Sequence, residues 1–248
     1  MPFRLPTEEE KADYVLAQFD RIAQRYDLTN DAISLGMHRF WKSVAVEKLA
    51  LDQTGSYLDV CCGTGDLSLI IARRLASTGK VVGLDFSPNM LAVAQRRAAG
   101  AKNVPAQLQW IRGDAQQLPF ADATFDGAMI SFGLRNLTDL QRGISEMARV
   151  VKPGGHVINL DLGHSTVPFF SPLFQFYFST IVPVIGMVLQ NDKQAYTYLP
   201  ESLSTYPKPD RITELFRNAA LRDVEHLALA MGSVALHIGT VGSGGAQN

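Results

Sequence analysis

Short apolar runs alternate with helical patterns through the middle of the chain. Five runs have the length of buried strands, and apolar residues at helical spacing fill the segments between most of them. The expected strands are 56–62, 81–85, 108–112, 125–131 and 156–162, and the expected helices are 67–75, 89–99 and 140–151. This alternation predicts an α/β fold with a doubly wound, mostly parallel sheet. Ligands of such sheets bind beyond the carboxyl ends of the strands.

The two ends of the chain have other patterns. Residues 8–50 are helical in pattern throughout, which predicts a helical cap before the sheet. After a helical segment at 209–220, two strand-like runs follow, and we expect them to complete the sheet as an antiparallel edge pair. The predicted parts are a cap (1–50), a ligand-binding core (51–163), an apolar helical insertion (164–200), and a completion of the sheet that ends in a frayed tail (201–248).

The insertion begins in a segment without formal charge. Residues 162–191 contain no Asp, Glu, Lys or Arg, and this length of 30 residues would suffice for a membrane span. Three prolines interrupt the segment, however, so we favour amphipathic helices that cover the active site and contact a membrane surface through 164–190. One helical face would carry Phe170, Phe174 and Phe178. An internal core patch or a homodimer contact is the alternative.

Composition narrows the class of protein. The chain has 248 residues, 46% of them hydrophobic, and can bury a core without disulfides or metals. Its net charge of −1 argues against a dedicated nucleic-acid binder. Its two cysteines, Cys61 and Cys62, are adjacent, which is unlike a disulfide scaffold. With no apolar run in the first ten residues, the sequence predicts a cytoplasmic protein. No His/Cys cluster has the spacing of metal ligands, and we expect no metal.

The first strand ends in a glycine-containing turn, 58–67 (LDVCCGTGDL). Gly63 and Gly65 let the backbone turn sharply and approach a ligand. A dinucleotide site needs a third glycine at position 68, where this chain has serine. Asp59 would also place negative charge beside a phosphate. The turn therefore favours a cationic ligand without phosphate, and S-adenosyl-L-methionine is such a ligand.

Two further strand ends agree with this ligand. Asp85 closes the second strand, where an acid would bind the ribose hydroxyls, and Ser87 offers a cap for the next helix. Asp114 and Ala115 follow the third strand, where the adenine edge would lie. The alternative is an ordinary tight turn with Asp85 as a helix cap.

With these residues in view, the sequence resembles the C-methyltransferase family of ubiquinone, menaquinone and phylloquinone biosynthesis over roughly residues 14–240. The matching stretches are 19–27 (FDRIAQRYD) with Asn30 and 34–36 (SLG), then 132–136 (FGLRN), and 232–237 (GSVALH). The resemblance implies a class I methyltransferase fold with helices on both faces of the sheet. It also implies cofactor contacts at Thr64, Asp85, Asp114, Ala115 and Ser131.

One stretch departs from the family, and one points to a branch of it. Residues 219–221 read Ala-Ala-Leu where the family usually has Ala-Gly-Phe. The Cys-Cys-Gly-Thr-Gly-Asp form of the first turn is similar to the plant and cyanobacterial branch, whose substrate is a naphthoquinone. The implied substrate is a lipophilic quinol, prenylated or phytylated; a benzoquinol is the alternative.

Ring methylation of a quinol needs alignment and help with a hydroxyl proton. Arg135 could stabilise a phenolate oxygen, and Asn136 could orient the hydroxyl. His237 is a candidate proton acceptor, because histidine titrates near neutral pH. Arg135 could instead neutralise nearby acids, and His237 could be structural. Asp161 and His164 are further candidates, and Tyr26 with Asp27 is expected to close a lid over the cofactor.

Three rival functions remain at this point. A nicotinamide oxidoreductase is disfavoured by the missing third glycine and by Asp59. A methyltransferase acting on nucleic acid or protein is disfavoured because residues 131–134 read Ser-Phe-Gly-Leu, where amino-methylating nucleic-acid enzymes carry an Asn/Asp-Pro-Pro-aromatic stretch. A non-catalytic cofactor-binding subunit is disfavoured by the presence of Arg135 and Asn136.

Overall fold

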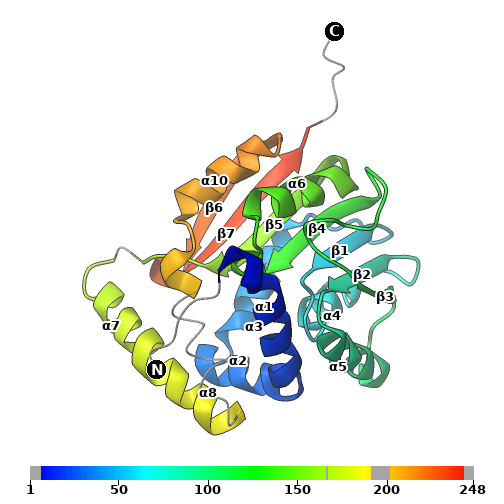
Figure 1. Ribbon diagram of the computed structural model, residues 1–248. Coiled ribbons are helices and arrows are strands. Elements are labelled where there is room, and N and C mark those ends of the chain that lie inside the picture. Colours follow the sequence, from blue (N-terminus) through cyan, green and yellow to red (C-terminus); the bar gives the residue numbers. More distant parts are fainter. Residues whose placement is uncertain (1–6, 166, 191–201, 243–248) are drawn as a thin grey trace.

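A seven-stranded sheet lies between two layers of helices in the computed structural model, which describes residues 7–165, 167–190 and 202–242 (Figure 1). The strand order is β3-β2-β1-β4-β5-β7-β6, and β7 runs antiparallel to both of its neighbours. The strands are β1 (Ser56–Val60), β2 (Lys80–Asp85), β3 (Gln107–Arg112), β4 (Phe125–Ser131), β5 (Val151–Leu162), β6 (Leu221–Leu229) and β7 (Val234–Val241). The predicted α/β fold and its antiparallel edge pair are confirmed.

Alternating side chains of the strands divide the core into two layers. Tyr57 and Met129 pack on one face with α3 and α4, whereas Leu58 and Ile130 pack on the other face with α6 and α10. The helices concerned are α3 (Met37–Lys48), α4 (Asp66–Ala72), α6 (Leu140–Val150) and α10 (Pro209–Asn218). Because both faces are covered, the residues that end the parallel strands are the ones left to contact a ligand.

Strand β5 begins five residues before the predicted start at position 156. Val151 already pairs with Phe125 of β4, and the register then shifts before Gly127 pairs with His156. The intervening Pro153, Gly154 and Gly155 had suggested a turn. They form the irregular part of the strand instead, since an interruption in the ladder accommodates a proline that cannot donate a hydrogen bond.

The helical cap consists of four short helices. They are α1 (Glu8–Ile22), η1 (Ala23–Arg25), α2 (Tyr26–Ser34) and α3. Thr7 and Glu10 form a reciprocal capping box at the start of α1. Leu35 and Gly36 both adopt left-handed backbone conformations, which ends α2 and turns the chain into α3.

The uncharged segment forms a continuous helical stretch beside the cap (Figure 1). It consists of α7 (Phe170–Phe176), a π-helical turn η3 (Tyr177–Ile181) and α8 (Val182–Gln190). Phe174 stacks on both Phe170 and Phe178, at ring distances of 6.0 and 5.2 Å, so the predicted common face is confirmed. Tyr177 donates a hydrogen bond to the carbonyl of Ile33, which fixes the stretch against α2.

By length and composition, residues 170–189 qualify as a candidate membrane span, with 17% of the stretch buried. In this structure the stretch packs along α2. The predicted tail, 242–248, lies almost wholly outside the described residues, as does the end of the predicted insertion, 191–200.

Candidate functional site

Two adjoining cavities lie at the carboxyl ends of the central strands. The first cavity has a volume of about 820 Å³ and the second about 910 Å³, with the open solvent at their mouths included. Their shared wall is formed by residues from the start of α2, the turn after β1, and the end of β4. These residues are Tyr26, Cys61, Gly63, Ser131 and Phe132. A molecule in the first cavity therefore lies next to a molecule in the second.

Asp85 closes β2 and faces the first cavity. Its carboxylate accepts hydrogen bonds from the backbone N–H groups of Gly63 (2.7 Å) and Ser87 (2.8 Å), which ties the turn after β1 to the start of α5 (Pro88–Gly100). Burial raises the pKa of Asp85 to about 6, although these hydrogen bonds oppose the shift. The Ser87 hydroxyl accepts from the Met90 N–H, so Ser87 caps α5 as predicted.

Asp114, Ala115 and Ser131 also line the first cavity. Asp114 is exposed at its rim and accepts a hydrogen bond from the Gln116 N–H at 2.8 Å. Ala115 is buried. The buried Ser131 hydroxyl, on the shared wall, has no hydrogen-bond partner among the described residues. A buried polar atom of this kind fits a site that a polar ligand completes.

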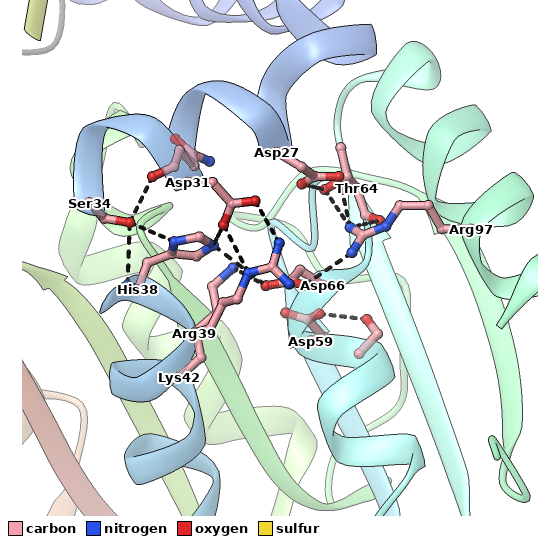
Figure 2. A network of polar contacts seen from close by, with 12 residues as sticks. Asp27, Asp31, Ser34, His38, Arg39, Lys42, Asp59, Thr64, Asp66 and Arg97 are labelled. Atoms are coloured by element: carbon pink, nitrogen blue, oxygen red, sulfur yellow. Dashed lines mark hydrogen bonds and ion pairs between the residues drawn. The ribbon is translucent and has the colours of Figure 1, made fainter. Parts of the chain in front are cut away.

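The cap closes over the turn that follows β1. Residues of α1 line the first cavity, and Thr64 donates a hydrogen bond to Asp27 at 2.6 Å (Figure 2). Arg97 of α5 pairs with Asp27 at 3.0 Å and also donates to the Thr64 carbonyl. Thr64 itself lines the second cavity rather than the first. These contacts link the cap, the turn and α5. Tyr26 and Asp27 thus lie over the turn after β1, which is the position that the predicted lid requires.

Asp59 and Gly65 line neither cavity. The Asp59 carboxyl is completely buried and accepts a hydrogen bond from Ser68 at 2.5 Å, and this burial raises its pKa to about 7. Ser68, in place of a third glycine, thus joins β1 to α4. At Gly65 (φ 77°), a Cβ atom would meet the Trp110 ring at 2.5 Å. The structure thus gives both residues a role within the fold, and the ligand contacts expected of them stay predictions.

Arg135 and Asn136 are placed on different cavities. Arg135 lines the second cavity and forms a buried ion pair with Asp161 at 2.7 Å, as well as a hydrogen bond to the Phe132 carbonyl. Asp161 is therefore the acid that the alternative interpretation of Arg135, as a neutralising charge, requires. Asn136 lines the first cavity. Both side chains adjoin the wall where the two cavities meet.

His237 does not reach either cavity, so the structure removes it as a candidate proton acceptor. It lies within β7, its Nε2 donates to the Pro209 carbonyl at 3.0 Å, and its side chain packs on Phe216. Burial lowers the pKa of His237 to about 4. His237 is far from the strand ends that form the cavities, because it pairs with Asn159 in mid-strand, three residues before the end of β5. His164 also lies outside both linings.

The second cavity contains polar residues that the sequence reasoning did not single out. His38, Trp41 and Lys42 reach it from α3, and Asp66 reaches it from the first turn of α4. Figure 2 shows His38, Lys42 and Asp66 in one network of polar contacts. Lys42 donates to Asp66 at 3.0 Å. No local feature of the sequence pointed to them, because the α2–α3 turn brings α3 over the strand ends only in the folded chain.

Comparisons with known proteins agree with this geometry. The sequence profile of the ubiE/COQ5 methyltransferase family matches residues 7–241. The chain belongs to this family. Two relatives are a demethylmenaquinone methyltransferase of Desulfitobacterium hafniense (strain Y51), 40% identical over 92% of this chain and 90% of the relative, and a ubiquinone/menaquinone biosynthesis C-methyltransferase of Haemophilus ducreyi (strain 35000HP), 37% identical over 96% and 91%.

Solved structures show the same fold at lower identity. An S-adenosylmethionine-dependent methyltransferase of Thermotoga maritima superposes with a TM-score of 0.60 at 18% identity, over 91% of this chain and 98% of that chain. The [4+2]-cyclase SpnF superposes with a TM-score of 0.61 at 16% identity, over 93% and 96%. These likenesses confirm the class I methyltransferase fold.

Membership of the family makes the protein an S-adenosyl-L-methionine-dependent methyltransferase. The first cavity suits this cofactor chemically. It offers two carboxylates, Asp85 and Asp114, to hydroxyl and amino donors, and the unpartnered Ser131 hydroxyl lies at its border with the second cavity. Within the described residues no group of three or more His, Cys, Asp and Glu side chains could hold a metal ion.

Proposed function

We propose that this methyltransferase C-methylates the ring of a demethyl naphthoquinol that carries an unsaturated polyprenyl tail. The observation that supports the proposal is the pair of adjoining cavities: one suits the cofactor, and the other combines polar groups with aromatic side chains. Relatives named demethylmenaquinone methyltransferase support the naphthoquinol ring. A phytyl tail, a benzoquinol ring or another small-molecule acceptor is the alternative.

In this proposal the first cavity holds the cofactor, which supplies a methyl group on a positively charged sulfur. Asp85 binds the ribose hydroxyls, Asp114 and Ala115 lie at the adenine, and Ser131 lies near the wall that the methyl group crosses. Gly63 permits the sharp turn beside the cofactor, since its φ of 55° is a conformation that residues with a side chain rarely adopt. Thr64 acts through its bond to Asp27. The chain thus contributes mainly alignment.

The second cavity holds the quinol ring beside this wall. Arg135 supplies positive charge near an oxygen of the ring, and its pairing with Asp161 fixes the guanidinium in place. Asn136 orients the ring from the first cavity. Phe174 and Phe178 provide an apolar wall for the tail. The reduced ring is the substrate, because only the electron-rich quinol is nucleophilic enough to accept the methyl group.

The test of this function is a substrate panel under anaerobic conditions. Protein and labelled cofactor are incubated with demethylmenaquinol, a phytylated naphthoquinol and a demethylated benzoquinol, and the products are identified by mass spectrometry. Methylation of the prenylated naphthoquinol at the highest kcat/KM supports the proposal. Preference for the benzoquinol or the phytylated compound would assign the alternative, and no methylation of any quinol would overturn the proposal.

We also propose that the α7–α8 stretch contacts a membrane surface, from which the tail enters. Its outer face exposes Phe169 (93%), Leu173 (64%) and Val188 (71%), while Phe174 and Phe178 face the second cavity. Exposed apolar patches of this kind mark interaction sites. The double substitution Leu173→Glu and Val188→Glu should abolish sedimentation with liposomes. Lipid-independent self-association that the same substitutions abolish would assign the face to a homodimer instead.

A further inference from the structure

The side chain of His38, at the start of α3, lines the second cavity. Its side chain is 8% exposed, and it lines the cavity together with Ser34 and Asp66. His38 can therefore contact a ring that is bound in the second cavity, whereas His237 lines neither cavity.

The hydrogen bonds of Ser34 favour one tautomer of His38. The Ser34 hydroxyl donates its single proton to the Asn30 carbonyl at 2.7 Å. It can then only accept from His38 Nδ1, which lies 2.7 Å away, and the His38 backbone N–H points to the same oxygen at 3.4 Å. This arrangement favours the tautomer of neutral His38 that has its proton on Nδ1 and its lone pair on Nε2.

Charged groups surround His38 Nε2 from three helices. Asp31 of α2 lies 3.8 Å away and Asp66 of α4 lies 4.0 Å away, beyond ordinary hydrogen-bond distance (Figure 2). From α3 itself, Lys42 pairs with Asp66 and Arg39 pairs with Asp31. Burial and the Lys42 charge lower the pKa of His38, while both carboxylates oppose the shift. The imidazole is thus neutral at pH 7, and two carboxylates stabilise it once it gains a proton.

Other titratable groups of the second cavity are poor proton acceptors near neutral pH. Burial raises the pKa of the Cys61 and Cys62 thiols, so they stay protonated. Burial also raises the pKa of Tyr177, whose hydroxyl already donates to a backbone carbonyl. Lys42 and Arg97 hold the pKa of Asp66 far below its usual range, which makes it a weak base.

We propose that His38 is the catalytic base that takes the proton from the quinol hydroxyl next to the methylated carbon. This assignment rests on the proposed function of the second cavity. The hydroxyl O–H bond breaks, its proton binds to His38 Nε2, and its electron pair stays on oxygen, which makes the ring a stronger nucleophile. After C-methylation the ring hydrogen leaves as a proton to solvent, the oxygen regains the proton from His38, and the histidine is neutral again.

The test compares His38→Gln with the matched variant His226→Gln, which removes a half-buried histidine on β6 that lines neither cavity. We expect His38→Gln to lower kcat at pH 7 by about 100-fold or more, with little change in KM. The wild-type kcat should fall on the acid side as His38 becomes protonated, below the usual histidine pKa of about 6.5. This acid limb should vanish in His38→Gln and persist in His226→Gln.

A second readout needs no turnover. In nitrogen-15 spectra of histidine-labelled protein, the signal lost in His38→Gln should show the tautomer with the proton on Nδ1 at pH 7.5. A proton on Nε2, or an unchanged acid limb in His38→Gln, would overturn the role of His38. The proposed function would still stand in that case, provided that the wild-type enzyme methylates a quinol. If the wild-type enzyme methylated no quinol, the proposed function would fail, and with it the role of His38.

Discussion

Replacing Asp85 with asparagine tests the cofactor cavity while preserving shape. The carboxylate accepts one hydrogen bond from Gly63 N–H and another from Ser87 N–H, one on each oxygen. An asparagine amide has one oxygen, so its NH₂ group must face one of these donors. Asp85→Asn therefore loses an acceptor for the backbone and the negative charge that a ribose hydroxyl would bind.

The size of the effect follows from the hydrogen bonds involved. A hydrogen bond to a charged group contributes about 1.5–3 kcal/mol, which corresponds to a loss of about 10- to 150-fold in cofactor affinity. The pH dependence has a definite sign. Wild-type affinity should decrease as the pH falls through about 6, because the protonated carboxyl of Asp85 accepts fewer hydrogen bonds. The affinity of Asp85→Asn should be flat over the same range.

Calorimetric titration with S-adenosylhomocysteine between pH 5.5 and 8 measures both effects. Asp122→Asn is the matched control, because Asp122 is an exposed acid paired with Arg149 that lines neither cavity. A Kd for Asp85→Asn within about threefold of the wild-type value would refute the placement of the ribose at Asp85, since the lost bond would then contribute less than about 0.7 kcal/mol.

Three further substitutions test the surrounding structure. Arg135→Ala removes the guanidinium that pairs with buried Asp161 and leaves that carboxylate two backbone N–H donors, so urea titration should show a loss of about 3 kcal/mol, with cofactor affinity nearly unchanged; intact stability would contradict the pairing. Asp27→Ala breaks the contacts with Thr64 and Arg97, so stopped-flow should show cofactor release about 2- to 10-fold faster, and an unchanged rate would exclude the lid. Ala220→Gly should stabilise the fold by about 0.5–1 kcal/mol, because φ there is +59°; a loss in urea would contradict this.

Periodicity and turn chemistry were enough to predict most of the fold. The predicted strand 125–131 matches β4 residue for residue, since its apolar pattern ends at a serine. The start of β5 was missed because Pro153-Gly154-Gly155 has the composition of a turn, and only the pairing of Val151 with Phe125 reveals the strand. The structure also explains why the family usually has glycine at position 220. Ala220 occupies a left-handed conformation, which glycine adopts more readily than alanine.

The site was less predictable, because its residues come from elements far apart in sequence. Asp85 and Ser131 end β2 and β4, the two strands that flank β1, so their position at the cavities follows from topology. His237 shows the limit of that reasoning: it was chosen for its chemistry, but it lies in mid-strand. Asp59 was read as a ligand contact, although its carboxyl is bonded to Ser68. His38 was missed because nothing local indicates that the α2–α3 turn folds back over the strand ends.

The position of the transferred methyl group shows most directly whether the protein methylates a ring carbon of the quinol. Enzyme, demethylmenaquinol and carbon-13 methyl-labelled cofactor are incubated without oxygen, and the product is examined by NMR. We expect a labelled methyl group bonded to a ring carbon, formed by the wild-type protein from the reduced substrate and not from the oxidised quinone. A labelled methoxy group on a ring oxygen, or equal turnover of the oxidised quinone, would contradict this expectation.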